Sequence, residues 1–560
     1  MAREDQISLT GTRDGLVEEV LAGRIGRREL LRRGSALGFS VGALSILVAA
    51  CGGGDEATED TSASDDAAGG EETAAEPVGV IRVATQKPAA TLDPVGMQDL
   101  GAYGLIAQCL EYLTHEADGD IGPGLATEWS ANADASEWSF TLREGVKWHD
   151  GSDFTSADVA ATFDRLVEFG NPALKGVIAK GSVNSSDPMK VVVKLEAPNG
   201  KFPYLVSIFN PQSAITPASF VLGSTLDGTP TGTGPFKLTA YDAATGCTFE
   251  RNLDWWGGTE GLAGSEWLFF DDAAAMVTAA LGGEVDAVVQ FQIADGDALF
   301  NDPNFVVLGA RCAAHREIWM RCDKGTFADK RVRQALAYTV DRPALVETLF
   351  KGKADLGNDT VVAPVYAFAD VSVPQRERDI EKAKALLAEA GVSMPVKAKL
   401  HFGLLQEIPQ LAQLLKQQAA DAGFELDLAG EDNGTFYGNA WCPAEPANPP
   451  CSGATELGIV DYGHRPTPDV YLNAALSTNG VWNSSQYMSP EFDAAFAEYS
   501  KATTTEATKA ACRKITDILM EDTPIIVPYH YNILSGHTTG FTGVRSTALG
   551  HLLLDKAAVA

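Results

Sequence analysis

The chain has 560 residues, of which 45% are hydrophobic and 8% aromatic, and it carries 43 Lys and Arg against 75 Asp and Glu, a net charge of −32. So acidic a surface repels phosphates, which excludes nucleic acid as an expected partner. A globular body of this length exceeds one ordinary hydrophobic core, so two or three lobes are expected.

Residues 1–50 are predicted to be an export signal. Arg27-Arg28 precede an apolar run over 34–50, which is shorter than the ~20 residues of a membrane helix and rich in Gly and Ser. The arginine pair resembles the twin-arginine export pattern, although general secretory signals are also basic at this point. Val48-Ala49-Ala50-Cys51 resembles a bacterial lipobox, so Cys51 is the expected lipid attachment point and mature N-terminus. The alternatives are an ordinary membrane anchor or a buried helix.

The acidic segment 51–77 is predicted to be a disordered tether. After Cys51 it has no basic residue and no apolar side chain larger than Ala, so it cannot bury enough surface to offset its ordering entropy. Its like charges keep it extended. The folded body is therefore expected outside the cytoplasm, in the periplasm or on the outer cell surface, and anchored to the cell membrane by the lipid.

The body begins near Val78, and its first part mixes antiparallel strands with helices. Ile81–Gln86 has a strand pattern, and a later alternating pattern ends in a turn at Asp150-Gly151. Thr155 and Asp158 form a capping box at the start of an amphipathic helix. The strand patterns KVVVKLEAP and CTFERN follow. The pattern up to about residue 289 indicates an α+β lobe.

Helices alternate with strands in the second part of the body. Apolar residues recur at helical spacing over 329–350. A further helix is predicted to start at Asp379 and to end at Gly391. PQLAQLLKQQAADAGFELDL is a helix leading into a strand, and EATKAACRKITDILMED is a further helix before the strand-like PIIVPYHYNIL. This alternation predicts an α/β lobe with a more parallel sheet.

Seven cysteines remain besides Cys51. The best disulfide pair is Cys442 and Cys451, which flank a short Pro-rich loop whose closure would contribute about 2–3 kcal/mol. Cys312 and Cys322 are a weaker pair, because an extended strand would hold them apart. Two others, Cys109 and Cys512, lie in helical patterns and are expected to be buried. The odd total leaves at least one free thiol.

Catalytic signatures are missing from the sequence. It has no H-E-x-x-H, no G-x-S-x-G and no Walker A motif, since GTPTGTGPFK lacks the Gly-Lys-Ser/Thr ending. Cys312 and His315 form a C-x-x-H, but no further ligands follow at metal spacing. We expect a binding protein and not an enzyme, with no catalytic residue, no metal and no cofactor. A triad assembled in space stays open.

Motifs along nearly the whole mature chain resemble the family 5 extracellular solute-binding proteins, the peptide/nickel class that serves ABC importers. They are TLDP, LATEWS, WSFTLREGVKWHDGSDFTSADVAATFDRL, GTGPFKLTAYD, ERNLDWWGG, GEVDAV and DKRVRQALAYTVDRPALVE, in that order. Most are structural motifs, such as the close turns of GTGPF. They identify the scaffold and say little about the ligand.

The resemblance implies an α/β fold of mixed lobes, the two-lobe periplasmic-binding-protein-like fold of type II, cluster C, with the ligand cleft between the lobes. Lobe I would span 78–308, lobe II 309–528, and residues 529–560 would return to lobe I. Ligand binding would favour closure about two crossover segments. The expected partners are a small-molecule or peptide ligand and ABC permease subunits in the membrane, and the protein is expected to be a monomer.

The resemblance also bears on the ligand. Peptide-binding members place an aspartate, in a segment resembling W-x-x-D-x-x-D-P, against the ammonium group of the peptide. Here Asp461 and Pro468 fit the frame, but Thr467 stands where the second aspartate is expected, and Asp469 follows one residue later. A buried ammonium without a carboxylate is costly, so this departure weakens the case for a free N-terminus. A peptide remains the first expectation, with a glycan, another amphiphilic molecule or a metal chelate as alternatives.

Aromatic residues near this segment are further predicted ligand contacts, because rings stack on sugars or peptide side chains. Ordinary core packing is the alternative for each. His464 lies in a loop after a strand, a common place for binding residues. The full predicted binding set is Tyr437, Trp441, Tyr462, His464, Thr467, Asp469 and Trp482.

Overall fold

The computed structural model describes residues 76–560 except 90–91, 98, 118–119, 172–173, 227–230 and 444–448. The predicted export signal, the lipid site Cys51 and nearly all of the predicted tether therefore lie outside the described residues. In the part of the chain that is described, no helix is long and apolar enough to cross a membrane.

A seven-stranded mixed sheet forms the centre of the part that we call lobe I. In spatial order its strands are β12 (Phe305–Ala310), β20 (Ile533–Thr538), β11 (Ala287–Phe291), β1 (Val80–Gln86), β10 (Gly264–Phe270), β9 (Gly246–Arg251) and β8 (Phe236–Asp242). β1 runs parallel to β10 and β11, and the other pairs are antiparallel. Because β20 lies between β11 and β12, the C-terminal segment completes this sheet.

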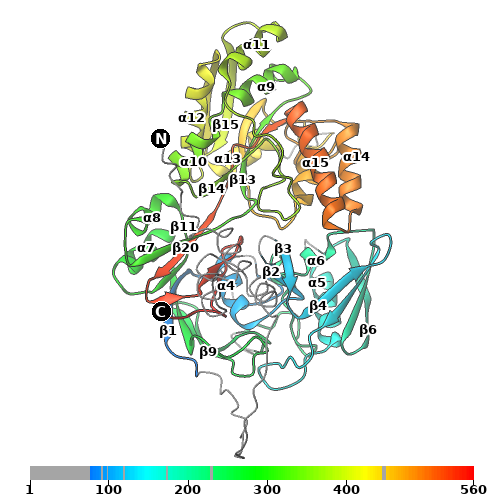
Figure 1. Ribbon diagram of the computed structural model, residues 1–560, viewed down its shortest axis with the longest axis vertical. Helices are drawn as coiled ribbons and strands as arrows, with labels where there is room; N and C mark the ends of the chain where they lie inside the picture. Colours follow the sequence, from blue (N-terminus) through cyan, green and yellow to red (C-terminus); the bar gives the residue numbers. More distant parts are fainter. Residues whose placement is uncertain are drawn as a thin grey trace, which may run out of the picture. The chain divides into compact units, whose positions relative to one another are not determined.

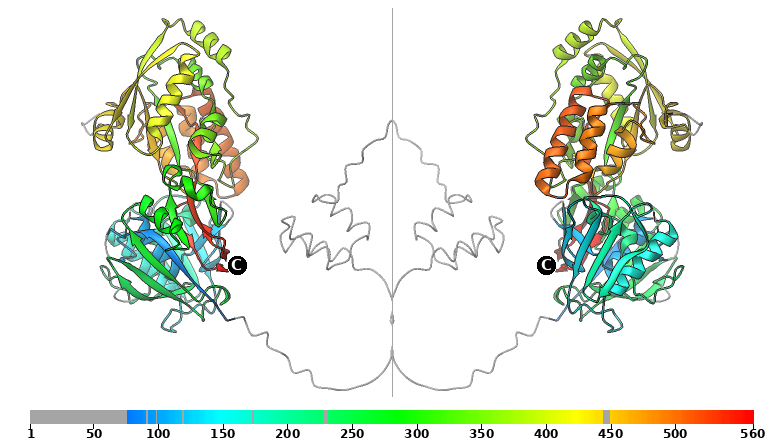
Figure 2. Two further views of the ribbon diagram at one scale, coloured as in Figure 1. Left: turned by 90° about the vertical axis from the view of Figure 1, so that its left-hand side faces the viewer. Right: turned by 90° about the vertical axis from the view of Figure 1, so that its right-hand side faces the viewer.

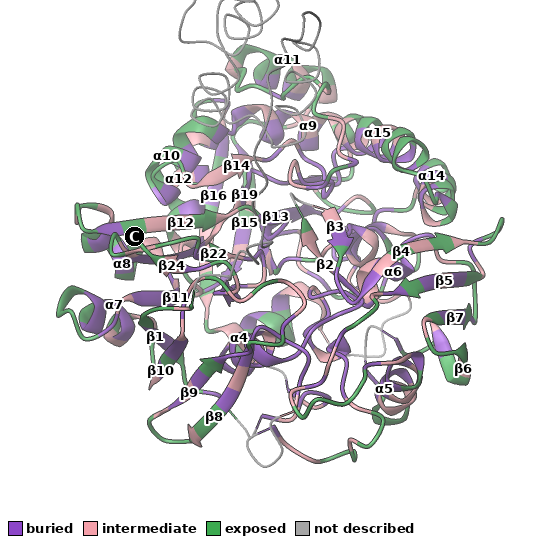
Figure 3. Ribbon diagram, turned by 60° about the horizontal axis from the view of Figure 1, so that its bottom comes forward, coloured by how far each residue is buried: buried purple, intermediate pink, exposed green. Residues whose placement is uncertain are grey.

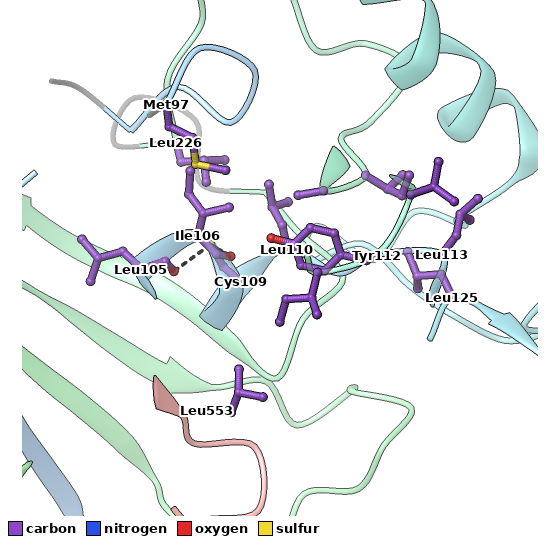
Figure 4. Close-up of a cluster of buried hydrophobic side chains, with 14 of the residues drawn as sticks. Met97, Leu105, Ile106, Cys109, Leu110, Tyr112, Leu113, Leu125, Leu226 and Leu553 are labelled. Carbon is purple, nitrogen blue, oxygen red and sulfur yellow. Dashed lines mark hydrogen bonds between the residues drawn. The ribbon is translucent and has the colours of Figure 1, made fainter. Parts of the chain in front are cut away.

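Smaller elements surround this sheet. Three two-stranded sheets pair β2 (Thr114–Ala117) with β3 (Asp120–Pro123), β21 (Phe541–Thr542) with β24 (Ala558–Val559), and β22 (Arg545–Ser546) with β23 (Leu552–Leu553). A four-stranded sheet has the order β4 (Ala126–Ala131), β5 (Glu137–Leu142), β7 (Lys190–Leu195) and β6 (Ile178–Asp187). The helices are α4 (Leu100–Cys109), α5 (Ser156–Phe169), α6 (Phe202–Leu205), the short η1 (Pro211–Ser213), α7 (Ala273–Leu281) and α8 (Ile293–Phe300). Figure 4 shows part of the lobe I core, to which α4 contributes Leu105, Ile106 and Cys109.

A second sheet forms the centre of lobe II. Its strands are β14 (Ala354–Leu356), β19 (Tyr529–Tyr531), β13 (His315–Met320), β17 (Leu457–Tyr462), β15 (Val396–Gly403) and β16 (Phe424–Glu431), and β18 (Ile525–Ile526) also pairs with β13. β15 is parallel to both β16 and β17, whereas β13 is antiparallel to β17. The more parallel sheet predicted here is present on the β17-β15-β16 side only.

The helices of lobe II are α9 (Lys330–Thr339), α10 (Arg342–Phe350), α11 (Ile380–Ala390), α12 (Ile408–Ala420), α13 (Asn433–Phe436), α14 (Pro490–Lys501) and α15 (Thr505–Asp522), with the wider turns η2 (Tyr437–Trp441) and η3 (Tyr471–Leu476). α14 and α15 lie side by side, drawn in orange in Figures 1 and 2. The helical pattern over 329–350 is broken into two helices at Val340–Asp341. Asp341 caps α10 through the N–H of Ala344, and Pro343 occupies its first turn.

The chain crosses between the two sheets twice. Residues 311–314 join β12 to β13, and Asn532 alone separates β19 from β20. In Figure 1 the green β13 and the red β20 lead away from this region in opposite directions. The inner strands β11, β13 and β17 are mostly buried, whereas the edge strands β12, β8, β14 and β16 are more open. Figure 3 shows green outer faces on the helices α5, α14 and α15. The two crossings are covalent links between the sheet of lobe I and the sheet of lobe II.

Several local predictions are confirmed. Thr155 and Asp158 form the capping box of α5, Asp379 caps α11, and Gly391 ends α11 with a left-handed backbone conformation. Cys312 and Cys322 are unpaired thiols, and Cys109 and Cys512 are buried thiols.

Candidate functional site

Three loops of lobe II meet at one edge of its sheet. β15, β16 and β17 are parallel and end at Gly403, Glu431 and Tyr462, so the segments that follow them leave the same edge. Loops beyond the carboxyl ends of parallel strands are the usual location of ligand sites in such sheets. β13 enters the sheet at this edge, where His315 pairs with Tyr462. The edge therefore lies directly beside the first crossing.

A buried ion cluster centres on Arg316 at this edge. The side chain is fully buried, and it stacks over the Tyr531 ring at 4.5 Å. Its Nε donates to Glu407 Oε1 at 2.8 Å and its Nη2 to Glu407 Oε2 at 2.9 Å, and Nη1 contacts Asp461 Oδ1. Tyr531 Oη also donates to Asp461 at 3.2 Å. Asp461, which fits the frame of an ammonium-binding aspartate, therefore already has a cationic partner.

The loop after β17 is held by three hydrogen bonds. Tyr471 Oη donates to the carbonyl of Gly463, and Tyr366 Oη donates to the carbonyl of Arg465 at 2.9 Å. The N–H of Ala313, in the first crossing, donates to His464 Nδ1 at 3.0 Å. The His464 ring also lies 5.3 Å from the ring of Phe209, a lobe I residue. His464 thus touches both lobes and the crossing.

A cavity of about 380 Å³ lies at this junction. Lobe I contributes Phe209, Glu116, Ser546 and Ala548 to its wall. The end of β12 contributes Ala310, the first crossing contributes Arg311, and lobe II contributes Val365, Tyr366, His464 and Pro466. The cavity is thus walled by both lobes, so a molecule bound in it would contact both.

Three histidines surround the backbone of Ala313. His315 Nδ1 lies 2.8 Å and His530 Nδ1 3.5 Å from its carbonyl, and His464 accepts its N–H. Burial lowers the pKa of His315 and His464 to about 3 and that of His530 to about 4. All three rings are therefore neutral near pH 7, and the Nε2 atom of each is buried without a hydrogen bond among the described residues.

Four of the predicted aromatic residues form one cluster. The Trp441 ring lies 5.4 Å from Tyr437, 6.4 Å from Tyr462 and 6.2 Å from Trp482, and Tyr462 and Trp482 are 6.1 Å apart. Tyr462 is buried, whereas 36% of Tyr437 is exposed. A disulfide joins Cys442 to Cys451 directly after Trp441, with 4.5 Å between their Cα atoms. The cluster therefore has a buried base and a partly exposed edge.

Thr467 and Asp469 belong neither to the cavity wall nor to the ring cluster. Thr467 is buried, and Asp469 accepts a hydrogen bond from Tyr499 Oη of α14 at 3.1 Å. Burial raises the pKa of Asp469, while hydrogen bonding and the charge of Lys201 oppose the rise. The Asp469 carboxylate therefore has protein partners already.

The sequence did not point to Arg316, Phe209, Arg311 or Ser546. Each comes from a segment distant from His464 along the chain, so only the register of β13 on β17 and the packing at the crossings bring them together. Within the described ranges, no group of three His, Cys, Asp or Glu side chains could hold a metal ion. The thiol of Cys312 donates to the carbonyl of Tyr531 rather than joining His315 in a ligand set.

Residues 120–442 match the model of the bacterial extracellular solute-binding proteins, family 5. The chain is 24% identical over 467 residues to the heme-binding protein A of Haemophilus influenzae, covering 77% of this chain and 82% of that protein. It is 23% identical over 397 residues to the nickel-binding periplasmic protein of Escherichia coli, covering 64% and 74%. The open, unliganded structure of MppA, a periplasmic murein tripeptide-binding protein, superposes with a TM-score of 0.75 at 22% identity, covering 87% of this chain and 98% of that one. The likeness confirms the expected type II periplasmic-binding-protein fold.

Proposed function

Because the chain belongs to the bacterial extracellular solute-binding proteins of family 5, we propose that it captures a small solute, with a peptide as the first candidate, in the cavity between its lobes and delivers it to the permease of an ABC importer. Members of this family bind solutes and act outside the cytoplasm. The matching proteins are named for heme, nickel and a murein tripeptide, so the scaffold alone does not select the ligand.

The cavity at His464 is the observation that carries this proposal. Its wall combines residues of lobe I, of the first crossing and of lobe II. A solute that contacts both lobes binds the closed arrangement more tightly than the open one, and that difference in affinity drives closure about the crossings. The permease then has a closed, loaded form to recognise.

The ion pairs of the site bear on which peptides fit. Asp461 is paired with Arg316, and Asp469 is held by Tyr499, so neither carboxylate is free for an ammonium group. This supports a peptide bound through contacts other than a buried N-terminal ammonium. A glycan stacked on Trp441 and Trp482, or a metal chelate, is the alternative on the same scaffold. An extracytoplasmic hydrolase is a weaker alternative, since the family consists of binding proteins.

A solute panel tests the proposal. The protein is purified without its first 77 residues and screened for thermal stabilisation with peptides of two to five residues, oligosaccharides, nickel–histidine and hemin. Binding to the native state at a hundred times Kd adds about 2.7 kcal/mol to the free energy of unfolding, which gives a clear rise in Tm. A rise with one class and no turnover of that solute supports the proposal. Product formation would favour the hydrolase, and no rise with any class would contradict the transport role.

The membrane attachment is a separate part of the proposal. The lipobox-like Val48–Cys51 supports a lipidated protein whose body is linked to the membrane by the acidic segment 51–77. Cys51→Ser removes the sulfur that would carry the lipid. The variant is expected in the soluble extracytoplasmic fraction and the wild type in the membrane fraction. Equal partitioning of Cys51→Ser and the wild type would refute the lipid anchor and would leave the proposed solute-binding role unaffected.

A further inference from the structure

The lobes also meet through residues that belong neither to the crossings nor to the cavity wall. Lys201, the N-cap residue of α6 in lobe I, is only 5% exposed. Its Nζ donates to the carbonyl of Ala502 at 2.9 Å and to Thr508 Oγ1 at 2.6 Å, both in lobe II. In Figure 1, α6 lies just below the orange helices α14 and α15. The cavity wall includes none of the three residues, so this contact joins the lobes at a separate place.

Lobe II offers the C-terminal end of α14 at this contact. The last carbonyls of a helix have no partner within the helix and carry partial negative charge, so a lysine ammonium is a favourable partner. Ala502 caps α14, and its carbonyl accepts from Lys201. The backbone N–H of Gly200 donates to the carbonyl of Ser500 at 3.3 Å. Lobe I thus supplies two hydrogen-bond donors to this helix end.

The backbones of the lobes approach each other closely at Gly200. A Cβ atom at this position would lie 2.3 Å from the carbonyl oxygen of Ala502. That oxygen belongs to the backbone and cannot swing away as a flexible side chain would. Glycine permits such a close approach, and a larger residue would have to push the lobes apart.

Asp469 adds the opposite charge near Lys201. The Lys201 Nζ lies 5.1 Å from the centre of the Tyr499 ring, and the hydroxyl of the same tyrosine donates to Asp469 Oδ2 at 3.1 Å. Burial raises the pKa of Asp469 and lowers that of Lys201, and the charge of each residue opposes the shift of the other. In the sequence, Asp469 stands two residues after Thr467, where the second aspartate of the ammonium-binding frame is expected. Its place near a lobe I lysine indicates a different role.

We propose that Lys201 and Asp469 form a clasp with the C-terminal end of α14, and that this clasp holds the lobes together with or without a solute. The clasp rests on the proposed function only in that closure of the lobes serves solute capture. Because it favours the closed arrangement before a solute binds, it raises the apparent affinity for any solute that both lobes contact. Lys201 and Asp469 are positioning residues, since neither lines the cavity.

The distance between the lobes tests the clasp without knowledge of the natural solute. Ala157→Cys on α5 and Ala494→Cys on α14, both exposed positions, carry spin labels for double electron–electron resonance. The protein is refolded from guanidinium without any solute, and the wild type is expected to have a closed population. Lys201→Met loses two hydrogen bonds between the lobes and should lower the ratio of closed to open molecules about tenfold. A wild type without a closed population, or a distribution that Lys201→Met leaves unchanged, overturns the proposal.

Control variants separate the clasp from general effects of charge and size. Lys180→Met removes a lysine whose ion pair lies within lobe I, and it is expected to keep the wild-type distances. Gly200→Ala places a methyl group against the carbonyl of Ala502 and is expected to lower the closed population. Gly540→Ala is its control, because the nearest atom to the added Cβ would be 3.8 Å away. Equal distributions for the two glycine variants would contradict the close approach of the lobes.

A double-mutant cycle tests the part of Asp469. Asp469→Asn keeps an oxygen that can accept from Tyr499 but loses the charge. It is expected to lower the ratio of closed to open molecules about threefold in the wild type, and to cause no such loss in Lys201→Met. The same loss in both backgrounds, or no loss in either, would exclude Asp469 from the clasp.

The solute panel keeps this inference separate from the proposed function. If a solute class stabilises the protein but the clasp variants keep the wild-type distances, the transport role stands and the clasp is refuted. If the clasp variants open the lobes but no solute class stabilises the protein, the clasp stands and the transport role fails.

Discussion

Removing the Arg316 guanidinium is predicted to be the most destabilising single change at the site. In Arg316→Met the carboxylates of Glu407 and Asp461, whose side chains are only 12% and 25% exposed, lose their shared cation. Removing one partner of a buried ion pair costs about 3–5 kcal/mol, because the remaining charge is left uncompensated. The hydrogen bond to Gln406 at 2.6 Å and the stacking on Tyr531 are also lost. The expected deficit therefore lies at the upper end of that range.

Urea unfolding of the variant and of the wild type at pH 7 measures this deficit. Arg513→Met is the control, because Arg513 also contacts two carboxylates, Asp370 and Asp517, but 39% of its side chain is exposed. A much smaller effect is expected for it. A deficit below about 1 kcal/mol for Arg316→Met would refute the reasoning.

Three further changes have defined outcomes. Burial raises the pKa of Glu111 from 4.5 to about 7. The unfolded chain therefore loses this proton at a lower pH than the folded protein does, and the free energy of unfolding falls as pH rises between those two values. When unfolding is measured across this pH range, Glu111→Gln should show a fall that is about 3 kcal/mol smaller. Replacing Cys442 and Cys451 by Ala should lower the free energy of unfolding by about 2–3 kcal/mol in calorimetry, and an unchanged value would argue against the loop-closure estimate. Lys201 of lobe I donates hydrogen bonds to Ala502 and Thr508 of lobe II, at 2.9 and 2.6 Å. Lys201→Met removes these bonds between the lobes and should weaken solute binding about tenfold in titration calorimetry. An unchanged affinity would mean that the same bonds are also present in the open form.

Local sequence patterns predicted much of the fold because their causes are local. The capping box of α5, the Asp379 cap and Gly391 terminus of α11, and the free state of Cys312 and Cys322 depend on neighbouring residues and strand geometry. The break between α9 and α10 was missed, although Asp341 and Pro343 carry its signal. Apolar periodicity continues through the break and hides it.

The site was predicted only in part because its contacts are non-local. Asp461 fits an ammonium-binding frame in the sequence, yet its charge is taken by Arg316, which lies opposite it only through the register of β13 on β17. His464 could be proposed from its loop. Its neighbours Phe209 and Ser546 come from lobe I, and no pattern near residue 464 refers to them. A pocket lined by both lobes and the first crossing is thus visible only once both cores are in place.

Native mass spectrometry of the protein purified from its own membranes tests the central claim most directly. If the cavity between the lobes is a solute site, the spectrum should show one small molecule bound per chain, and the molecule should dissociate on unfolding and restore its Tm shift when added back. A chain without any bound molecule that is also not stabilised by any member of the solute panel would contradict the account.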